Sequence, residues 1–207
     1  MLIKTVSEDS IKDSKKLDEL IELACKLGAT DAAVISAADI SVEDDLAGLC
    51  RNTRCESYGL SASCPPHVAG PAGFRELLKH FKRAVVFKID VPTDMLFSDG
   101  RSELFRLLHE IAARIEQSAV EMGYHNSKGY AGGSCKSIFC RNQPDCRVVD
   151  RHDVCRNPQL ARQSMSGFGI NVPKLVKSAG WKFTDASQRK DKHEKSVATL
   201  YGLVLVG

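Results

Sequence analysis

The sequence predicts a single α/β domain over residues 1–207, with a mostly parallel or mixed sheet, flanking helices and two cysteine-rich loops. Three observations support this prediction. Helical and strand-like apolar patterns alternate along the chain, and the composition is that of a globular protein, with 43% hydrophobic and 27% charged residues. Seven of the eight cysteines fall in two short segments. No linker or repeat divides the chain, and 207 residues can bury a core without cross-links.

Apolar spacing predicts the elements of the N-terminal half. A helix is expected from Ser14, a capping residue type, to Gly28, with apolar residues three and four apart between them. A short buried strand follows at residues 32–36, and a loop-rich stretch then runs through the first cysteines. Pro71 can open a second helix, because the first turn does not need its missing N–H. Residues 84–91 form the clearest strand.

The C-terminal half is expected to continue the alternation after a glycine-rich segment at residues 129–135 that is neither a Walker nor a Rossmann motif. The expected elements are a helix from Ser102 to about Met122, a helix at 158–167, a helix from Pro173 to Gly180, a strand at 181–183, an exposed loop at 188–195 and a buried strand at 197–206.

Composition excludes several classes of protein. The N-terminal residues contain no long apolar stretch of the kind found in a signal peptide, and no run approaches the ~20 apolar residues of a membrane span. The net charge of +3, from 29 basic and 26 acidic residues, is too small to indicate a nucleic-acid partner. The sequence therefore predicts a cytoplasmic protein with no membrane and no nucleic-acid association.

The cysteines carry the chemistry. We call Cys50, Cys55 and Cys64 the first cysteine set, and Cys135, Cys140, Cys146 and Cys155 the second cysteine set. In a reducing compartment, clustered thiols bind metal or do redox chemistry more often than they form disulfides. Neither set contains the Cys-x2-Cys pair common in zinc sites, and the wider spacing suits an iron–sulfur cluster. The predicted cofactor is one or two [4Fe–4S] clusters, with zinc as the runner-up.

The two sets differ in number. The second set supplies four thiols, enough for one cluster, whereas the first supplies three and ends in Cys64-Pro65. The fourth position of the first site is open to His67, Cys25, a distant residue or a substrate. Cys25 lies beside the apolar face of the first helix and is expected to be a buried structural thiol.

Basic residues surround both sets: Arg51, Arg54, Lys136, Arg141, Arg147, Arg151 and Arg156. Such cations stabilise an anionic cluster, or they pair with nearby acids such as Asp145, Asp150 and Asp153. For individual arginines we favour pairing. If the strands before both sets are parallel, the two loops emerge at the same sheet edge and the sites are neighbours.

Taken together, the motifs resemble an uncharacterised family of predicted metal-binding proteins found largely in anaerobic bacteria and archaea. The matching motifs are Cys50-x4-Cys55-x2-Tyr58-Gly59-x4-Cys64-Pro65-Pro66, Gly133-Ser134-Cys135 with Cys140, Cys146 and Cys155-Arg156-x-Pro158, and Ala161-Arg162-x-Ser164-Met165-x3-Gly169-Ile170-Asn171-Val172. The resemblance implies metal binding by these cysteines, as iron–sulfur clusters, and no particular reaction. The chain departs from the family pattern in the wider spacing of its second set and in Asn171, where the family often has Asp.

Three functions fit these observations. The first is an iron–sulfur protein that transfers electrons to a redox partner protein. The second is an enzyme in which the three-cysteine cluster keeps an open iron for substrate, because catalytic metal sites keep a vacant position. The third is a zinc-stabilised binding module without a redox role. No serine nucleophile elbow or paired-acid motif indicates another kind of catalysis.

Overall fold

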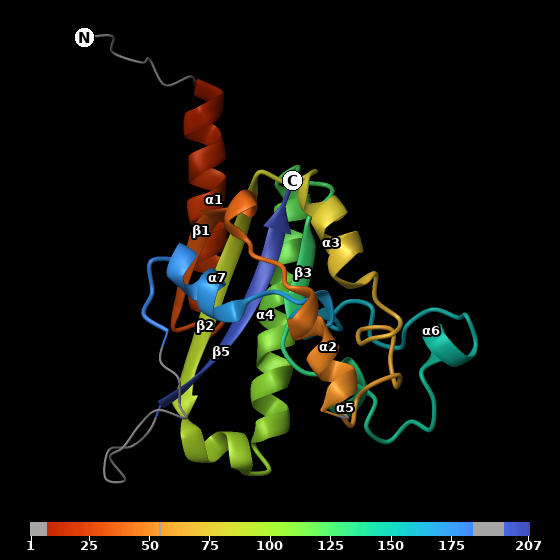
Figure 1. Ribbon diagram of the computed structural model, residues 1–207. Coiled ribbons are helices and arrows are strands. Elements are labelled where there is room, and N and C mark those ends of the chain that lie inside the picture. The colour runs from red at the N-terminus through yellow and green to blue at the C-terminus, as the bar shows by residue number, and fades with distance from the viewer. Residues whose placement is uncertain (1–7, 54, 184–196) are drawn as a thin grey trace.

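A five-stranded sheet of order β1-β2-β5-β3-β4 forms the centre of the computed structural model, which describes residues 8–53, 55–183 and 197–207 (Figure 1). Its strands are β1 (Asp31–Ser36), β2 (Arg83–Pro92), β3 (Lys128–Ala131), β4 (Gln163–Ser164) and β5 (Val197–Val206). The β1–β2, β2–β5 and β5–β3 pairs are antiparallel, and β3–β4 is parallel. The α/β class is thus confirmed, with the mixed form of the sheet.

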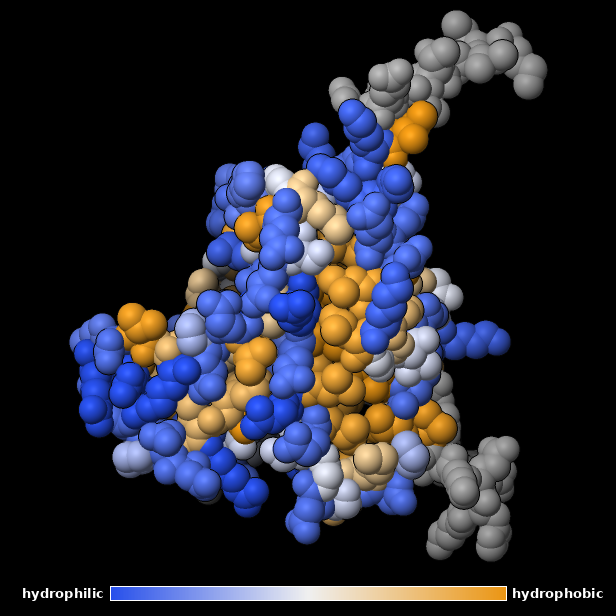
Figure 2. Space-filling view, turned by 180° about the vertical axis from the view of Figure 1, so that it is seen from behind, coloured by the Kyte–Doolittle hydropathy of each residue, from blue (hydrophilic) through white to orange (hydrophobic). Residues whose placement is uncertain are grey.

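Helices cover both faces of this sheet. They are α1 (Glu8–Lys26), α2 (Asp44–Asn52), α3 (Gly70–Leu78), α4 (Arg101–Glu121), α5 (Cys135–Phe139), α6 (Arg147–Asp150) and α7 (Val172–Ser178), with 3₁₀ turns η1 (Ala37–Asp39), η2 (Thr93–Phe97) and η3 (Met165–Phe168). α1 and α4 pack on one face, and α3, α7 and η3 pack on the other. Figure 2 shows the α1 and α4 face, where a band of apolar side chains is visible between hydrophilic strips. Within the described residues, no helix has the length and apolarity to cross a bilayer.

The alternation of side chains along the strands builds two cores. On β2, Val85 and Phe87 face the α1 and α4 layer, while Val86 faces the opposite layer. In the second core, the ring of Phe74 lies edge-on to Tyr130, with ring centroids 5.2 Å apart. Tyr130 is thus a packing residue, and it anchors the strand that leads to the second cysteine set.

Most predicted elements are present with shifted ends. α1 begins at Glu8, so Ser14 lies inside the helix, and Ser102 likewise lies inside α4, whose N-cap is Gly100. The predicted strands at 32–36, 84–91 and 197–206 and the helices opened by Pro71 and Pro173 are confirmed. The predicted loop at 188–195 lies outside the described residues.

Three local predictions are wrong. Residues 158–167 contain β4 and the start of η3 in place of a helix, because the amides of Arg162 and Ser164 donate to His109 Nδ1 and Ser63 O. A backbone committed to such distant acceptors cannot also form the helical i→i−4 ladder. Residues 181–183 form no strand, and the first cysteine set does not lie wholly in a loop, because Cys50 is on α2.

The expected parallel strands before the two sets are also absent. Through the antiparallel pairs β1–β2, β2–β5 and β5–β3, the strands β1 and β3 run in opposite directions. Only the second set directly follows a strand, β3, since α2 intervenes before the first. The two sets nevertheless become neighbours, because residues 55–65 fold back against the segment that opens α5.

A short backbone junction positions α2 and with it Cys50. The amide of Glu43 donates to Gly169 O over 2.8 Å, and the amide of Asn171 donates to Ser41 O over 2.9 Å. Gly169 has φ +68°, and a Cβ there would lie 2.1 Å from Glu43 O, so only glycine fits. The Asn171 amide group bridges the junction, accepting from the backbone of Lys174 at the start of α7 and donating to the Glu43 carboxylate.

We expect Asn171→Ala to lower the free energy of unfolding by about 1 kcal/mol, because α7 loses its N-cap acceptor. Asn171→Ser, which keeps a capping oxygen, is expected to recover most of this loss. Urea unfolding followed by circular dichroism measures both variants. Equal stability of the wild type and Asn171→Ala would show that the cap contributes nothing.

Candidate metal centre

The first cysteine set lies on the wall of a large cavity. Cys50 is in the last turn of α2, Cys55 follows that helix, and Cys64 is buried, with 6% of its surface exposed. The intervening loop is held by its own backbone, since Cys55 N–H donates to Cys50 O and Gly59 N–H donates to Pro65 O. All three thiols line one cavity of about 700 Å³.

The second cysteine set surrounds a much smaller recess. Cys135 begins α5, Cys140 follows its end, Cys146 precedes α6, and Cys155 lies beyond it. All four line a recess of about 20 Å³. The hydroxyl of Ser134 accepts from the Lys136 amide at the start of α5, which places Cys135 in its first turn. Four thiols from 21 residues of chain thus line one recess.

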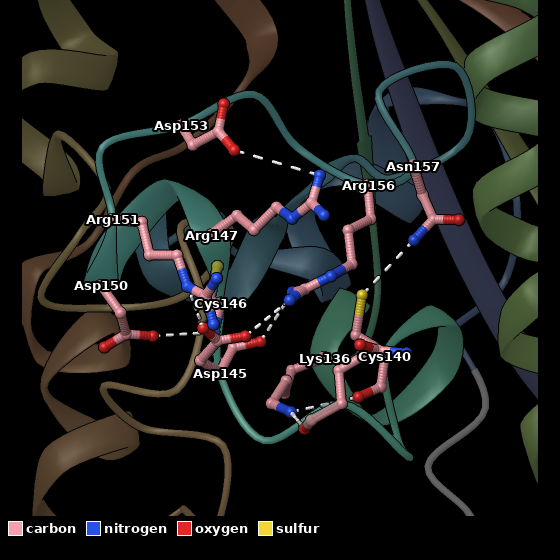
Figure 3. Close-up of polar contacts among 11 residues, drawn as sticks. Lys136, Cys140, Asp145, Cys146, Arg147, Asp150, Arg151, Asp153, Arg156 and Asn157 are labelled. Atoms are coloured by element: carbon pink, nitrogen blue, oxygen red, sulfur yellow. Dashed lines mark hydrogen bonds and ion pairs between the residues drawn. The ribbon is translucent and has the colours of Figure 1, made fainter.

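Ion pairs shape the loop that carries Cys146 and Cys155 (Figure 3). The Asp145 carboxylate accepts from Arg156 at 2.6 Å and also from Arg151, and these arginines hold the pKa of Asp145 below its usual value. Arg147 lies 4.0 Å from Asp153. The preferred interpretation of these three arginines, pairing with nearby acids, is confirmed. Arg54 lies outside the described residues.

Asn157 directs two N–H groups at sulfur. Its side-chain amide donates to Cys140 Sγ over 3.3 Å (Figure 3). Its backbone amide donates to Cys155 Sγ over 3.4 Å. Hydrogen bonds of this kind orient thiolate ligands and stabilise their negative charge. One residue therefore supports two of the four sulfurs of the second set.

Three buried serines connect the two sets. Ser61 Oγ lies 3.0 Å from Ser63 Oγ and 3.3 Å from Ser134 Oγ. Ser63 Oγ in turn accepts from the Cys135 amide and lies 3.8 Å from Cys64 Sγ. The serine network therefore touches one cysteine of each set. The sequence signal was present, as Ser61-x-Ser63-Cys64 and Ser134-Cys135, but serine alone does not indicate such a role.

The surroundings disfavour negative charge on two thiols when no cation is near. Burial raises the pKa of Cys50, and the charges of Cys55 and Cys64 raise it further. Burial also raises the pKa of Cys135, hydrogen bonds from Ser63 and Ser61 lower it, and the charges of Cys155 and Cys64 raise it. Metal ligation requires the thiolate, so a bound cation would supply the charge that these sites lack.

Cys25 and His67, the two candidates for the fourth ligand of the first site, have different surroundings in the structure. Cys25 is exposed on α1, so the expectation of a buried thiol is wrong. The buried stripe of α1 consists of Leu17, Leu20 and Ala24, and Cys25 falls just outside it. His67 is exposed, and its Nε2 lies 3.1 Å from Gly59 O. Its role as a ligand stays a prediction.

The donor chemistry of the site fits a thiolate-bound metal group. All eight cysteines are free thiols, and seven of them line the two cavities. Across residues 8–53, 55–183 and 197–207, no three Cys, His, Asp or Glu side chains converge on a point suited to a single metal ion. The sulfurs instead lie on the walls of the cavities, where soft metals that prefer thiolates would be held.

His109 links two segments that lie next to the site, and it was not identified as a candidate residue from the sequence. Its side chain is fully buried, its Nδ1 accepts from the Arg162 amide over 3.0 Å, and its Nε2 lies 3.1 Å from Gly132 O. It thereby joins the glycine segment before Cys135 to the segment before Ser164. The signal in the sequence was a histidine among the apolar residues of a long helix.

Comparison with known proteins agrees with this chemistry. No curated protein and no solved structure matches the chain. A family model described as "Predicted metal-binding protein (DUF2284)" matches residues 33–206, which include the whole sheet except the first two residues of β1, and both cysteine sets. The resemblance to a metal-binding family is thus confirmed, and the chain belongs to this family of predicted metal-binding proteins.

Proposed function

We propose that the protein is an iron–sulfur protein that binds two [4Fe–4S] clusters and transfers electrons to a redox partner protein. The observation that carries this proposal is the division of seven free thiols into two adjoining groups, four of which line one recess and three of which line one cavity of about 700 Å³. Cysteine thiolates are the usual ligands of such clusters, and four complete a [4Fe–4S] site.

The second cysteine set is suited to electron transfer alone. Four thiols leave no ligand position for a substrate, and the recess that they line is small. The N–H groups of Asn157 and the guanidinium of Arg156, which lines the recess, favour the anionic state of a thiolate cluster. This site would store and release one electron without exposing a reactive iron.

The first cysteine set supports a second candidate function, substrate binding at an open iron. Three thiols would hold three corners of a cluster, and the fourth corner would face the large cavity. A metal with a vacant position acts as a Lewis acid toward an oxygen ligand. In this function the closed site supplies electrons to the open one, and the serine network of Ser61, Ser63 and Ser134 lies between them.

Metal analysis of protein isolated without oxygen tests the proposal. We expect about eight iron and eight sulfide per chain, from two clusters of four each, with absorption near ~400 nm that bleaches on reduction. A preparation that holds zinc and no iron would overturn the proposal and favour the zinc-stabilised binding module. A spectroscopic change in the reduced protein on adding a small molecule would separate the open-iron enzyme from a simple electron carrier.

Asn157→Leu is expected to lower the reduction potential of the second site by roughly 40 mV, the equivalent of about 1 kcal/mol for one electron. The variant loses the N–H···S bond to Cys140, which stabilises the more negative, reduced cluster, while the backbone bond to Cys155 remains. A redox titration followed by electron paramagnetic resonance measures the shift.

Asn142→Leu is the matched control, because Asn142 is exposed in the same loop and forms no hydrogen bond among the described residues. Its potential should equal that of the wild type. An unchanged potential in Asn157→Leu would show that this amide does not act on the cluster.

A further inference from the structure

The large cavity has the dimensions of a ligand site. Its volume of about 700 Å³ lies within the ~300–1,000 Å³ typical of small-molecule pockets. Its walls come from four separate parts of the chain: the loop of the first cysteine set, the start of α4, α5 and the segment around β4. Such convergence of distant segments makes a shaped pocket with polar groups on several sides.

Two arginines on these walls are free to bind an anion. Arg101 and Arg141 both line the cavity, and among the described residues neither forms an ion pair. The Arg101 guanidinium lies 5.5 Å from the centre of the Phe105 ring, which also lines the cavity, so this group is held against the wall. A guanidinium offers paired N–H donors that match the two oxygens of a carboxylate.

An unpartnered hydroxyl on the wall is available to the same kind of ligand. Ser164 lines the cavity with only 6% of its surface exposed, and its hydroxyl forms no hydrogen bond among the described residues. This hydroxyl therefore has no partner within the part of the protein that the structure describes. A ligand oxygen in the cavity would provide one, close to the first cysteine set.

Two carboxylates limit the charge of the ligand. Glu56 and Asp99 also line the cavity, and they balance the charges of Arg101 and Arg141. A strongly anionic ligand such as a nucleoside triphosphate would be repelled by them. A small carboxylic acid that also carries a hydroxyl or amino group suits a cavity with charges of both signs. Its carboxylate can pair with an arginine, and its hydroxyl or amino group can donate to Glu56 or Asp99.

We propose that this cavity binds a small hydroxy- or amino-carboxylic acid, with its carboxylate on Arg101 and Arg141 and its hydroxyl or amino group directed toward the first cysteine set. This inference names the substrate class of the open-iron function proposed above and rests on it for the role of the bound molecule. The binding itself depends on the arginines, so it can be measured separately from the cluster.

Isothermal titration calorimetry of anaerobically isolated protein with malate, lactate and glycine tests this, with choline and glucose as cationic and neutral probes. We expect at least one of the acids to bind, and choline and glucose not to bind. Arg101→Ala and Arg141→Ala should each weaken binding about tenfold or more, the loss of one charge-assisted contact. Ser164→Ala should weaken it by a smaller factor. Arg114→Ala, an exposed arginine on α4 outside the cavity, should leave binding unchanged.

Iron and sulfide are measured on every preparation, so the two proposals fail separately. Full iron content with no preference for the acids, or with binding unaffected in both arginine variants, overturns the carboxylate site and leaves the clusters standing. Protein without iron or sulfide overturns the cluster proposal, while malate binding that depends on Arg101 and Arg141 still supports the site.

Discussion

Cys64→Ala is expected to remove about half of the iron and half of the sulfide while the rest of the protein keeps its fold. Cys64 belongs to the three-thiol set on the large cavity and lines no part of the small recess. A site reduced from three thiols to two cannot hold a cubane, whereas the four thiols of the second set are untouched. Alanine differs from a buried cysteine by one sulfur atom, so the packing loss is small.

The measurement combines iron and sulfide analysis with the reduced-state electron paramagnetic resonance spectrum. One of the two signals should disappear in Cys64→Ala, and the other should disappear in the double variant Cys140→Ala/Cys155→Ala, which likewise leaves only two thiols at its site. Cys25→Ala is the control, since this exposed thiol lies on α1, outside both cavities. Its metal content should match that of the wild type.

Two outcomes would contradict the two-site arrangement. Iron that stays at the wild-type level in Cys64→Ala would show that the first set holds no cluster. Complete loss of iron in both variants would indicate one shared site, for which the close approach of Ser63, Cys64 and Cys135 offers a structural basis.

The strongly patterned parts of the fold could be predicted from the sequence. β2 and β5 read as apolar strands because both are buried on two faces, and α4 reads as a helix because its apolar residues recur every three or four positions. The two cysteine sets could be identified equally well from the sequence. Their division into two sets follows from number and spacing, which the chain order alone displays, whereas their closeness in space comes from contacts between distant segments.

The parts that escaped prediction depend on contacts between distant segments. The edge strand β4 is only two residues long and exists because it pairs with β3, which begins in a glycine segment with little strand character. Cys25 was expected to be buried because it neighbours an apolar stripe, and a shift of one position on a helix turns a side chain by about 100°. The cavity, with Arg101 and Ser164 on its walls, arises only in three dimensions.

His109 should be the most destabilising single substitution among the polar residues that support the site. We expect His109→Leu to lower the free energy of unfolding by roughly 3 kcal/mol, because it leaves two buried backbone groups, the Arg162 amide and the Gly132 carbonyl, without partners. Leucine roughly preserves the volume, so the loss reports on hydrogen bonding. His125→Leu, an exposed histidine, is the matched control and should be close to neutral.

The pH dependence of the free energy of unfolding gives an independent test of the role of His109. Burial lowers the pKa of His109 from 6.5 to about 4, opposed by its hydrogen bond to Gly132 and assisted by the charge of Arg162, whose ion-pair partner is Glu116. The unfolded chain therefore takes up a proton near pH 6.5 while the folded protein does not until about pH 4. The contribution is fully present above pH 6.5 and is lost as the pH falls, by about 1.4 kcal/mol per unit.

Urea unfolding of the wild type and His109→Leu at pH 7.5, 6.5 and 5.5 separates this histidine from the carboxylates, which titrate in both proteins. The difference in stability should be largest at pH 7.5 and shrink by about 1 kcal/mol at pH 5.5, because only the wild type is weakened by protonation of His109 in its unfolded state. A difference that stays constant with pH would mean that the folded protein protonates His109 at the same pH as the unfolded chain does. His109 would then be charged in the folded protein below about pH 6.5, where its Nδ1 could no longer accept from the Arg162 amide, and the link between the segments before Cys135 and Ser164 would need another explanation.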